Sequence, residues 1–167
     1  MGLFNFLKGT DTAAEITFPA TLGAASKGHV IPMEEIPDPV FSIGAVGLCC
    51  GIEPDEGMVY APIDSKVGQV ADTGHAIGLE AGGMDILIHV GVDTVDMEGK
   101  GFVSKVKVGQ SVKKGDLLMT MDLDAIRAAG HPTTVITVIT NSDDYSSVET
   151  VASGQVGYGS DLMRISK

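Results

Sequence analysis

Short apolar runs, broken by turn residues, follow one another from "ITFPA" to the end of the chain. Runs of this length and spacing predict β-strands. So many short strands in one domain predict an antiparallel β-sandwich or a partly closed barrel. The expected strands are Val40–Val46, Met58–Ala61, Lys66–Ala71, Ala76–Glu80, Asp85–Val90, Gly101–Lys105, Leu117–Met121, Thr134–Thr140 and Leu162–Ile165.

One stretch has a helical pattern instead. "DLDAIRAAG", residues 122–130, predicts a brief helix, because Gly130 is a stop signal and Pro132 follows it. "GQSVKKGD", residues 109–116, predicts a turn-rich connection between strands. The fold class expected from these patterns is all-β, with one or two short helical turns.

The chain of 167 residues is long enough for one domain with a real core. We expect this domain to cover residues 15–167, with its core at about 36–140. Residues 1–14 look separate from it and amphipathic. Either this segment is a frayed terminus, or residues 1–12 make a weak contact with a membrane surface or a partner. The apolar residues of the segment include Leu3, Phe4, Phe6 and Leu7.

The net charge and the cysteines limit the classes of partner and the cellular compartment that we expect. The net charge of −11 repels phosphate backbones, which argues against nucleic acid and in favour of basic proteins. Cys49 and Cys50 are adjacent and cannot form an ordinary disulfide framework, so we expect both to be small core residues. The start of the chain lacks the basic region and apolar core of a signal peptide. These features predict a cytoplasmic protein.

Candidate chemistry lies between residues 73 and 93. In "DTGHAI", Thr73 and His75 are two positions apart, and in "IHVGVD" the same spacing links His89, Gly91 and Asp93. If both stretches are extended, Thr73 shares a face with His75, and His89 shares one with Asp93. Gly91 would leave room for another group to approach His89.

A histidine on an apolar strand has two readings: a hydrogen-bonded core residue, or part of a site. Burial lowers the pKa of an imidazole and keeps its lone pair free, which suits a nucleophile or a metal ligand. In phosphoryl transfer one ring would attack phosphorus, and the other, oriented by Thr73, would donate a hydrogen bond. Zinc-dependent hydrolysis would need a third protein ligand to the metal, for which Asp93, Cys49 or Cys50 could serve. The sequence has no H-x-H spacing, however.

"GGMDILIHVGVDTV" resembles the signature around the phosphorylated histidine of the glucose-type IIA proteins of the bacterial sugar phosphotransferase system. "YAPIDSKVGQVADTGHAI" resembles the second active-site strand of that family, with Thr73 and His75 in matching places. "IPDPVFSIGAVGLCCGIEP" and "EGKGFVSKVKVGQSVKKGDLLMTMDLDAI" are also similar to family segments. The similarity runs from about residue 30 to the end.

The resemblance implies a function that the periodicity leaves open. His89 would accept a phosphoryl group on its tele nitrogen from the carrier HPr and pass it to the IIB domain of a membrane sugar transporter. His75 would stabilise the transfer, Thr73 would orient His75, and Asp93 would be a carboxylate beside the site. The family's phosphorylation state also signals sugar supply, so regulated enzymes or transporters are further implied partners. Neither a cofactor nor a metal is implied, and His29 and His131 are expected to be non-catalytic.

Two other classes of protein remain as alternatives. "VKVGQSVKKGDLL" resembles the strand-turn-strand of lipoyl- or biotin-carrier modules, but no Met-Lys-Met-like tripeptide is present to carry the group. A zinc-binding hydrolase on a related barrel would account for two histidines, although the H-x-H is missing. The phosphocarrier is the function that the sequence favours.

Overall fold

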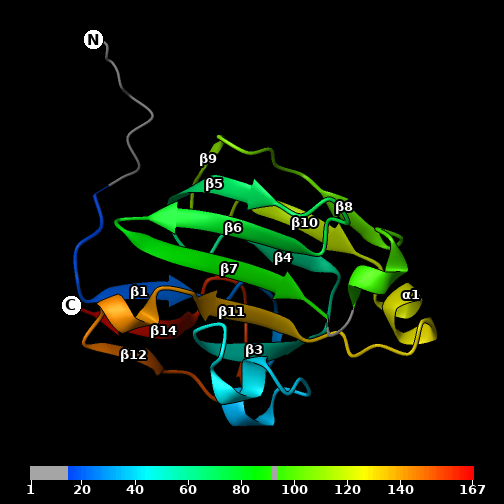
Figure 1. Ribbon diagram of the computed structural model, residues 1–167, viewed down its shortest axis with the longest axis horizontal. Coiled ribbons are helices and arrows are strands. Elements are labelled where there is room, and N and C mark those ends of the chain that lie inside the picture. The colour runs from blue at the N-terminus through cyan, green and yellow to red at the C-terminus, as the bar shows by residue number, and fades with distance from the viewer. Residues whose placement is uncertain (1–14, 92–93) are drawn as a thin grey trace.

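The computed structural model describes residues 15–91 and 94–167, and its strands form three antiparallel sheets (Figure 1). One sheet has the strand order β1-β14-β12, another β4-β10-β8, and a larger one β13-β2-β3-β11-β7-β6-β5-β9. The strands are β1 (Ala20–Gly23), β2 (Gly28–Ile31), β3 (Leu48–Pro54), β4 (Met58–Tyr60), β5 (Ser65–Val70), β6 (Ala76–Ala81), β7 (Met84–Val90), β8 (Phe102–Ser104), β9 (Ser111–Val112), β10 (Leu117–Met121), β11 (Val135–Ile139), β12 (Ser147–Thr150), β13 (Gln155–Val156) and β14 (Asp161–Ser166). The predicted all-β class is confirmed, and the sheets do not close into a barrel.

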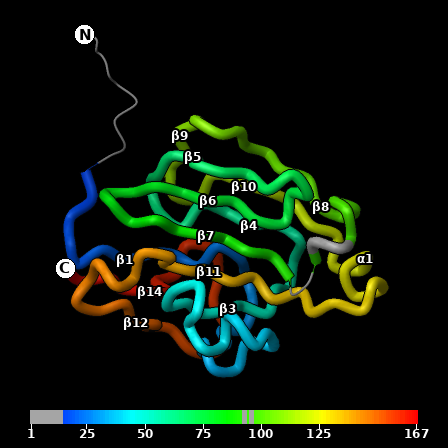
Figure 2. Tube along the Cα trace, in the orientation of Figure 1, coloured from blue at the N-terminus to red at the C-terminus, as the bar shows by residue number. Residues whose placement is uncertain are grey.

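Strand β7 lies in the middle of the large sheet, between β6 and β11, and Figure 2 shows the three running side by side. Its side chains alternate between two apolar layers. Ile86, Ile88 and Val90 are buried in the main core, whereas Leu87 packs against a second cluster on the opposite face. Because both faces of this strand are covered, its sequence is apolar almost throughout.

The second cluster forms where the chain crosses the outer face of the large sheet. Two short 3-10 helices, η1 (Met33–Glu35) and η2 (Phe41–Ile43), lie on this crossing. Phe41 packs there against Ile136 and Val138 of β11. The cluster includes Ile136, the residue of β11 that pairs with His89 of β7.

The predicted strand Val40–Val46 is wrong, because η2 occupies this stretch and the next strand starts at Leu48. Asp38 Oδ1 accepts hydrogen bonds from the backbone N–H groups of Val40 (2.7 Å) and Phe41 (3.0 Å). A carboxylate that satisfies these donors favours a turn over a strand. Gly44 follows with a φ of +73°, which is incompatible with a regular strand.

The predicted helix is confirmed as α1 (Leu123–Ala128). Asp122 caps it by accepting a hydrogen bond from the N–H of Ala125, and Gly130 adopts a φ of +85° just beyond it. The connection 109–116 contains the two-residue strand β9, which pairs with β5. Two further 3-10 helices, η3 (Thr94–Met97) and η4 (Ser142–Asp144), complete the described elements. The expectations for residues 1–14, including the contact through 1–12, lie outside the described residues.

We predict that Ile88→Ala lowers the free energy of unfolding by about 2–5 kcal/mol, because this side chain is fully buried in the main core. Val103 is 52% exposed on β8, so Val103→Ala should change it by less than about 0.5 kcal/mol. Urea unfolding followed by circular dichroism measures both. Equal effects of the two substitutions would contradict this description of the core.

Candidate functional site

His89 is the penultimate residue of β7 and lies in a row of paired residues across the large sheet. Ala76 of β6 pairs with it on one side and Ile136 of β11 on the other. Its side chain as a whole is half-buried, but less than 1 Å² of the Nδ1 atom is exposed. Burial of Nδ1 leaves Nε2 as the candidate nitrogen of this imidazole for contact with another molecule.

His75 reaches the same place from the turn between β5 and β6. Ala71 and Ala76 close this turn with a backbone hydrogen bond of 2.9 Å, and Gly74 within it has a φ of +76°. The turn brings the Oγ1 of Thr73 to 2.5 Å from the Nδ1 of His75. This hydrogen bond orients the imidazole and directs its Nε2 away from Thr73.

The two imidazoles are in contact. Their ring centroids are 5.0 Å apart and the rings are nearly perpendicular, at 84°. Phe41 lies against His89 with ring centroids 4.9 Å apart, and Phe102 lies 6.4 Å from His75. A backbone hydrogen bond from the N–H of Val90 to the carbonyl of His75 (2.8 Å) ties the two segments together. The predicted closeness of His75 and His89 is thus present.

The surroundings of His75 favour its neutral form. Burial lowers the pKa of His75 from its ordinary value of 6.5, because the charged imidazolium loses hydration. If the hydroxyl of Thr73 donates to Nδ1, the ring proton resides on Nε2. His75 is then a hydrogen-bond donor aimed away from Thr73.

The expected role of Gly91 in opening an approach to His89 is not what the geometry favours. Strand β7 ends at Val90, and Gly91 has a φ of +76°, so the alternation assumed for residues 89–93 stops there. A Cβ at Gly91 would collide with the Cγ2 of Thr94 and would lie 3.1 Å from the carbonyl oxygen of Pro132. Glycine is therefore required by the turn and its packing. Asp93 lies outside the described residues.

The adjacent cysteines are buried on opposite faces of β3. Burial, with smaller contributions from Asp38 and Glu34, raises the pKa of Cys49 to about 11. Burial also raises the pKa of Cys50 to about 12. Both side chains are core residues, as predicted, and as thiols they are poor nucleophiles at neutral pH.

The other two described histidines lie elsewhere. His29 is exposed on β2, and His131 is half-buried in the segment after α1. Neither was predicted to be catalytic. The residues that the sequence analysis missed are Phe41 and Phe102, whose contacts with the imidazoles come from segments far from either histidine in the chain.

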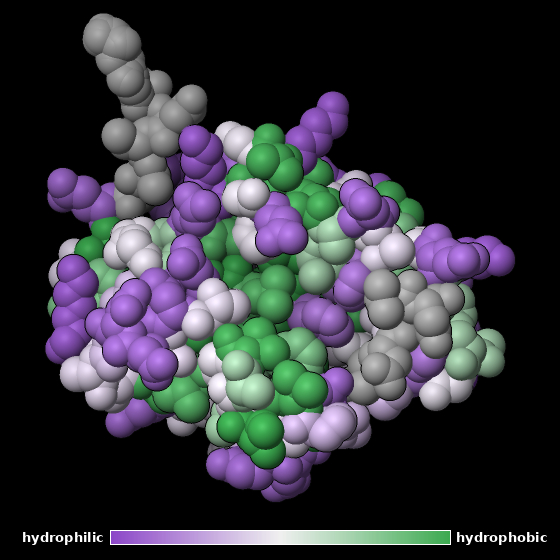
Figure 3. All heavy atoms as spheres, in the orientation of Figure 1, coloured by the Kyte–Doolittle hydropathy of each residue, from purple (hydrophilic) through white to green (hydrophobic). Residues whose placement is uncertain are grey.

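An apolar surface adjoins the imidazole pair on the side of η2. Val40 is 48% exposed and Ile43 75% exposed, next to Phe41, whose ring contacts His89. Figure 3 shows apolar side chains gathered where the η1–η2 crossing lies on this face. Exposed apolar groups beside a reactive group are typical of a protein-docking surface.

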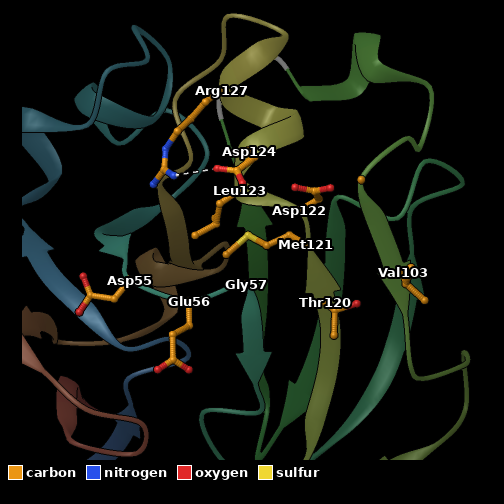
Figure 4. Close-up of a pocket in the computed structure, with 11 residues that line it drawn as sticks. Asp55, Glu56, Gly57, Val103, Thr120, Met121, Asp122, Leu123, Asp124 and Arg127 are labelled. Carbon is orange, nitrogen blue, oxygen red and sulfur yellow. Dashed lines mark ion pairs between the residues drawn. The ribbon is translucent and has the colours of Figure 1, made fainter.

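A separate groove of about 770 Å³ lies between α1, β8, β10 and the turn before β4 (Figure 4). Its acidic groups have structural partners. Asp122 caps α1, Asp124 pairs with Arg127 at 3.8 Å, and Asp55 accepts a hydrogen bond from Gln155 at 2.6 Å. None of the predicted site residues that the structure describes lines this groove.

Comparisons with known proteins agree with the observed fold and show the family of the chain. Residues 20–145 match the model of the phosphoenolpyruvate-dependent sugar phosphotransferase system EIIA 1 family. The chain is 43% identical over 147 residues to a glucose-specific EIIA component of Bacillus cereus, covering 87% of this chain and 89% of that one. It is 44% identical over 146 residues to a β-glucoside-specific EIIBCA component of Dickeya chrysanthemi, covering 87% of this chain but 23% of that longer one.

A solved structure, glucose permease IIA from Mycoplasma capricolum, superposes with a TM-score of 0.78 at 31% identity. The match covers 86% of this chain and 94% of that one. Fold and relatives together define a phosphocarrier of the sugar phosphotransferase type. The chain belongs to the EIIA type 1 family of that system. The family match gives no support to a zinc hydrolase or a lipoyl- or biotin-carrier module.

In residues 15–91 and 94–167 no helix has the length and apolar character needed to cross a membrane.

We predict that His75 titrates below pH 6.5 in the folded protein, since burial disfavours its charged form. The unfolded chain then binds this proton at a higher pH than the folded chain does. The contribution of His75 therefore destabilises the fold as pH falls through 6.5 and vanishes above it. NMR titration of the ring gives the midpoint, and urea unfolding from pH 5 to 8, compared with His75→Gln, gives the linkage. A midpoint at or above 6.5 would contradict the prediction.

Proposed function

We propose that His89 is the phosphoryl acceptor of this phosphocarrier and that it reacts through Nε2. The observation that carries the proposal is the pair of contacting imidazoles, in which the Nδ1 of His89 is buried and Nε2 is the nitrogen that remains for the reaction. Phospho-HPr, the donor implied by the family, brings a phosphorus atom bonded to an imidazole nitrogen. The lone pair of His89 Nε2 attacks this phosphorus, the new N–P bond forms, and the donor imidazole leaves with the electrons of the old one.

His75 supports this step as a hydrogen-bond donor. We assign the donor role in the hydrogen bond between Thr73 Oγ1 and His75 Nδ1 to the hydroxyl, which places the ring proton on Nε2. That N–H faces the space beside His89, where charge spreads over the three oxygens of the transferring group. A donor placed in advance costs no reorganisation during transfer, and removing such a donor typically slows an enzyme by about 100-fold or more.

The phosphoryl group then passes to the IIB domain of a membrane sugar transporter by the same displacement. The relatives support this partner, since some carry this domain within an EIIBCA chain. The names of these relatives include both glucose and β-glucoside, so we assign the choice of sugar to the membrane partner. The apolar surface formed by Val40 and Ile43 would dock both partners in turn, and the net charge of −11 favours basic ones. Exchange with HPr places the protein in the cytoplasm, and regulated enzymes or transporters could use the same surface.

Asp93 would lie beside the site as a carboxylate, and residues 1–12 would give a weak contact with a membrane surface. Both proposals rest on the sequence pattern and the resemblance. The proposed chemistry needs neither a cofactor nor a metal.

We predict that phosphoenolpyruvate, enzyme I and HPr add one phosphoryl group to the protein, at His89. Intact-mass measurement detects it, and the label should be acid-labile and alkali-stable. His89→Ala should abolish labelling, because no other described histidine takes its place in the pair. His29→Ala, at an exposed position on β2, is the matched control and should label normally. Labelling that persists in His89→Ala would refute the site.

We predict that His75→Ala still folds but slows at least one transfer step by roughly 100-fold or more, because the donor to the phosphoryl oxygens is lost. Thr73→Val should slow the same step by less, since it only loosens the orientation of His75. Rapid-quench kinetics with phospho-HPr measures both variants. Unchanged rates in His75→Ala would mean that His89 works alone.

A further inference from the structure

A chain of hydrogen bonds crosses the large sheet from β3 to the turn after His89. The hydroxyl of Thr134, directly before β11, donates to Oε1 of Glu53 on β3 at 2.5 Å. The main-chain carbonyl of the same Thr134 accepts a hydrogen bond from the N–H of Gly91 at 2.7 Å. One residue thus links a carboxylate on β3 to the backbone that follows the proposed acceptor.

Burial makes the first of these bonds difficult to replace. Thr134 is fully buried, and Glu53 is half-buried. A buried hydroxyl that loses its acceptor carries the full cost of its desolvation, and a hydrogen bond to a carboxylate is stronger than one between neutral groups. The Glu53 carboxylate therefore anchors Thr134 to β3 through its side chain, and the carbonyl of the same residue accepts the hydrogen bond from Gly91.

The second bond acts on one particular peptide group. The carbonyl of Val90 and the N–H of Gly91 belong to the same planar peptide unit, and Val90 is the residue directly after His89. The hydroxyl of Thr94 donates to that carbonyl at 2.6 Å, while Thr134 accepts from that N–H. The peptide plane is therefore held from both sides, at a point where Gly91 has a left-handed φ of +76°.

We propose that Glu53 is a positioning residue for His89, acting through Thr134 and the Val90–Gly91 peptide. This rests on the proposed function, in which His89 must present Nε2 in line with the phosphorus. Transfer of this kind depends mainly on placement and charge stabilisation, so a loosened backbone beside the nucleophile slows the step itself. Docking of the donor involves the apolar surface at η2 and stays unchanged.

The first test is a double-mutant cycle measured by rapid-quench labelling with phospho-HPr. Glu53→Ala and Thr134→Val should each lower the maximal transfer rate by about 10-fold and leave the donor concentration for half-maximal rate unchanged. The double variant should be no slower than either single one, because both changes break the same link. Independent, multiplying effects would overturn the proposal.

Conservative variants separate the hydrogen bond from the charge. Glu53→Gln keeps an acceptor oxygen for the Thr134 hydroxyl but removes the charge, and Thr134→Ser keeps the hydroxyl. Both should retain most of the wild-type rate. A Glu53→Gln protein as slow as Glu53→Ala would show that the carboxylate acts by its charge, against the proposal. Glu149→Ala, at an exposed carboxylate on β12 in another sheet, is the control and should transfer at the wild-type rate.

A measurement without any donor distinguishes this proposal from the proposed function. Amide hydrogen exchange of Gly91 should be faster in Glu53→Ala and in Thr134→Val, and the ring ¹⁵N shifts of His89 should move. If wild-type protein takes no phosphoryl group, the proposed function fails, while these signals still decide whether Glu53 is coupled to His89. Thr134→Val keeps the shape of the side chain and serves as the test if Glu53→Ala does not fold. Unchanged amide exchange of Gly91 in Thr134→Val would refute the coupling.

Discussion

The antiparallel pairing of β7 between β6 and β11 is the constraint on which the site depends. It puts Ala76 and Ile136 on either side of His89, and it brings His75, at the start of β6, within contact of the same ring. A shift of one residue in either register would turn His89 toward the main core. Such a shift would also bury Asp85, which is exposed on the outer face of β7, in the main core, and this cost opposes it.

The same packing sets the chemistry of the imidazoles. Phe41 contacts His89, and burial lowers the pKa of His75 from its ordinary value, which favours the neutral form of the His75 ring. The hydrogen bond with Thr73 holds the ring of His75 in one orientation. The end of a central strand, a turn and a crossing segment together bring two imidazoles and an aromatic ring into contact.

Local patterns in the sequence were enough for most of the strands and for α1, whose cap Asp122 and following Gly130 are both visible in the letters. They failed at Val40–Val46, because the run is as apolar as a strand but Asp38 satisfies the N–H groups that a strand would pair. They also assigned Gly91 a role beside His89, whereas its left-handed φ and its contact with Thr94 end the strand there.

By itself the sequence determined the all-β class, the apolar strand that contains His89, and Thr73 beside His75, since each depends on neighbours within a few positions. Only the tertiary structure decided that the two imidazoles touch, that Phe41 and Phe102 flank them, and that Glu53 connects through Thr134 to the turn after His89. These contacts join residues more than ten positions apart in the chain. They depend on strand order and register, which the pattern along a single chain does not specify.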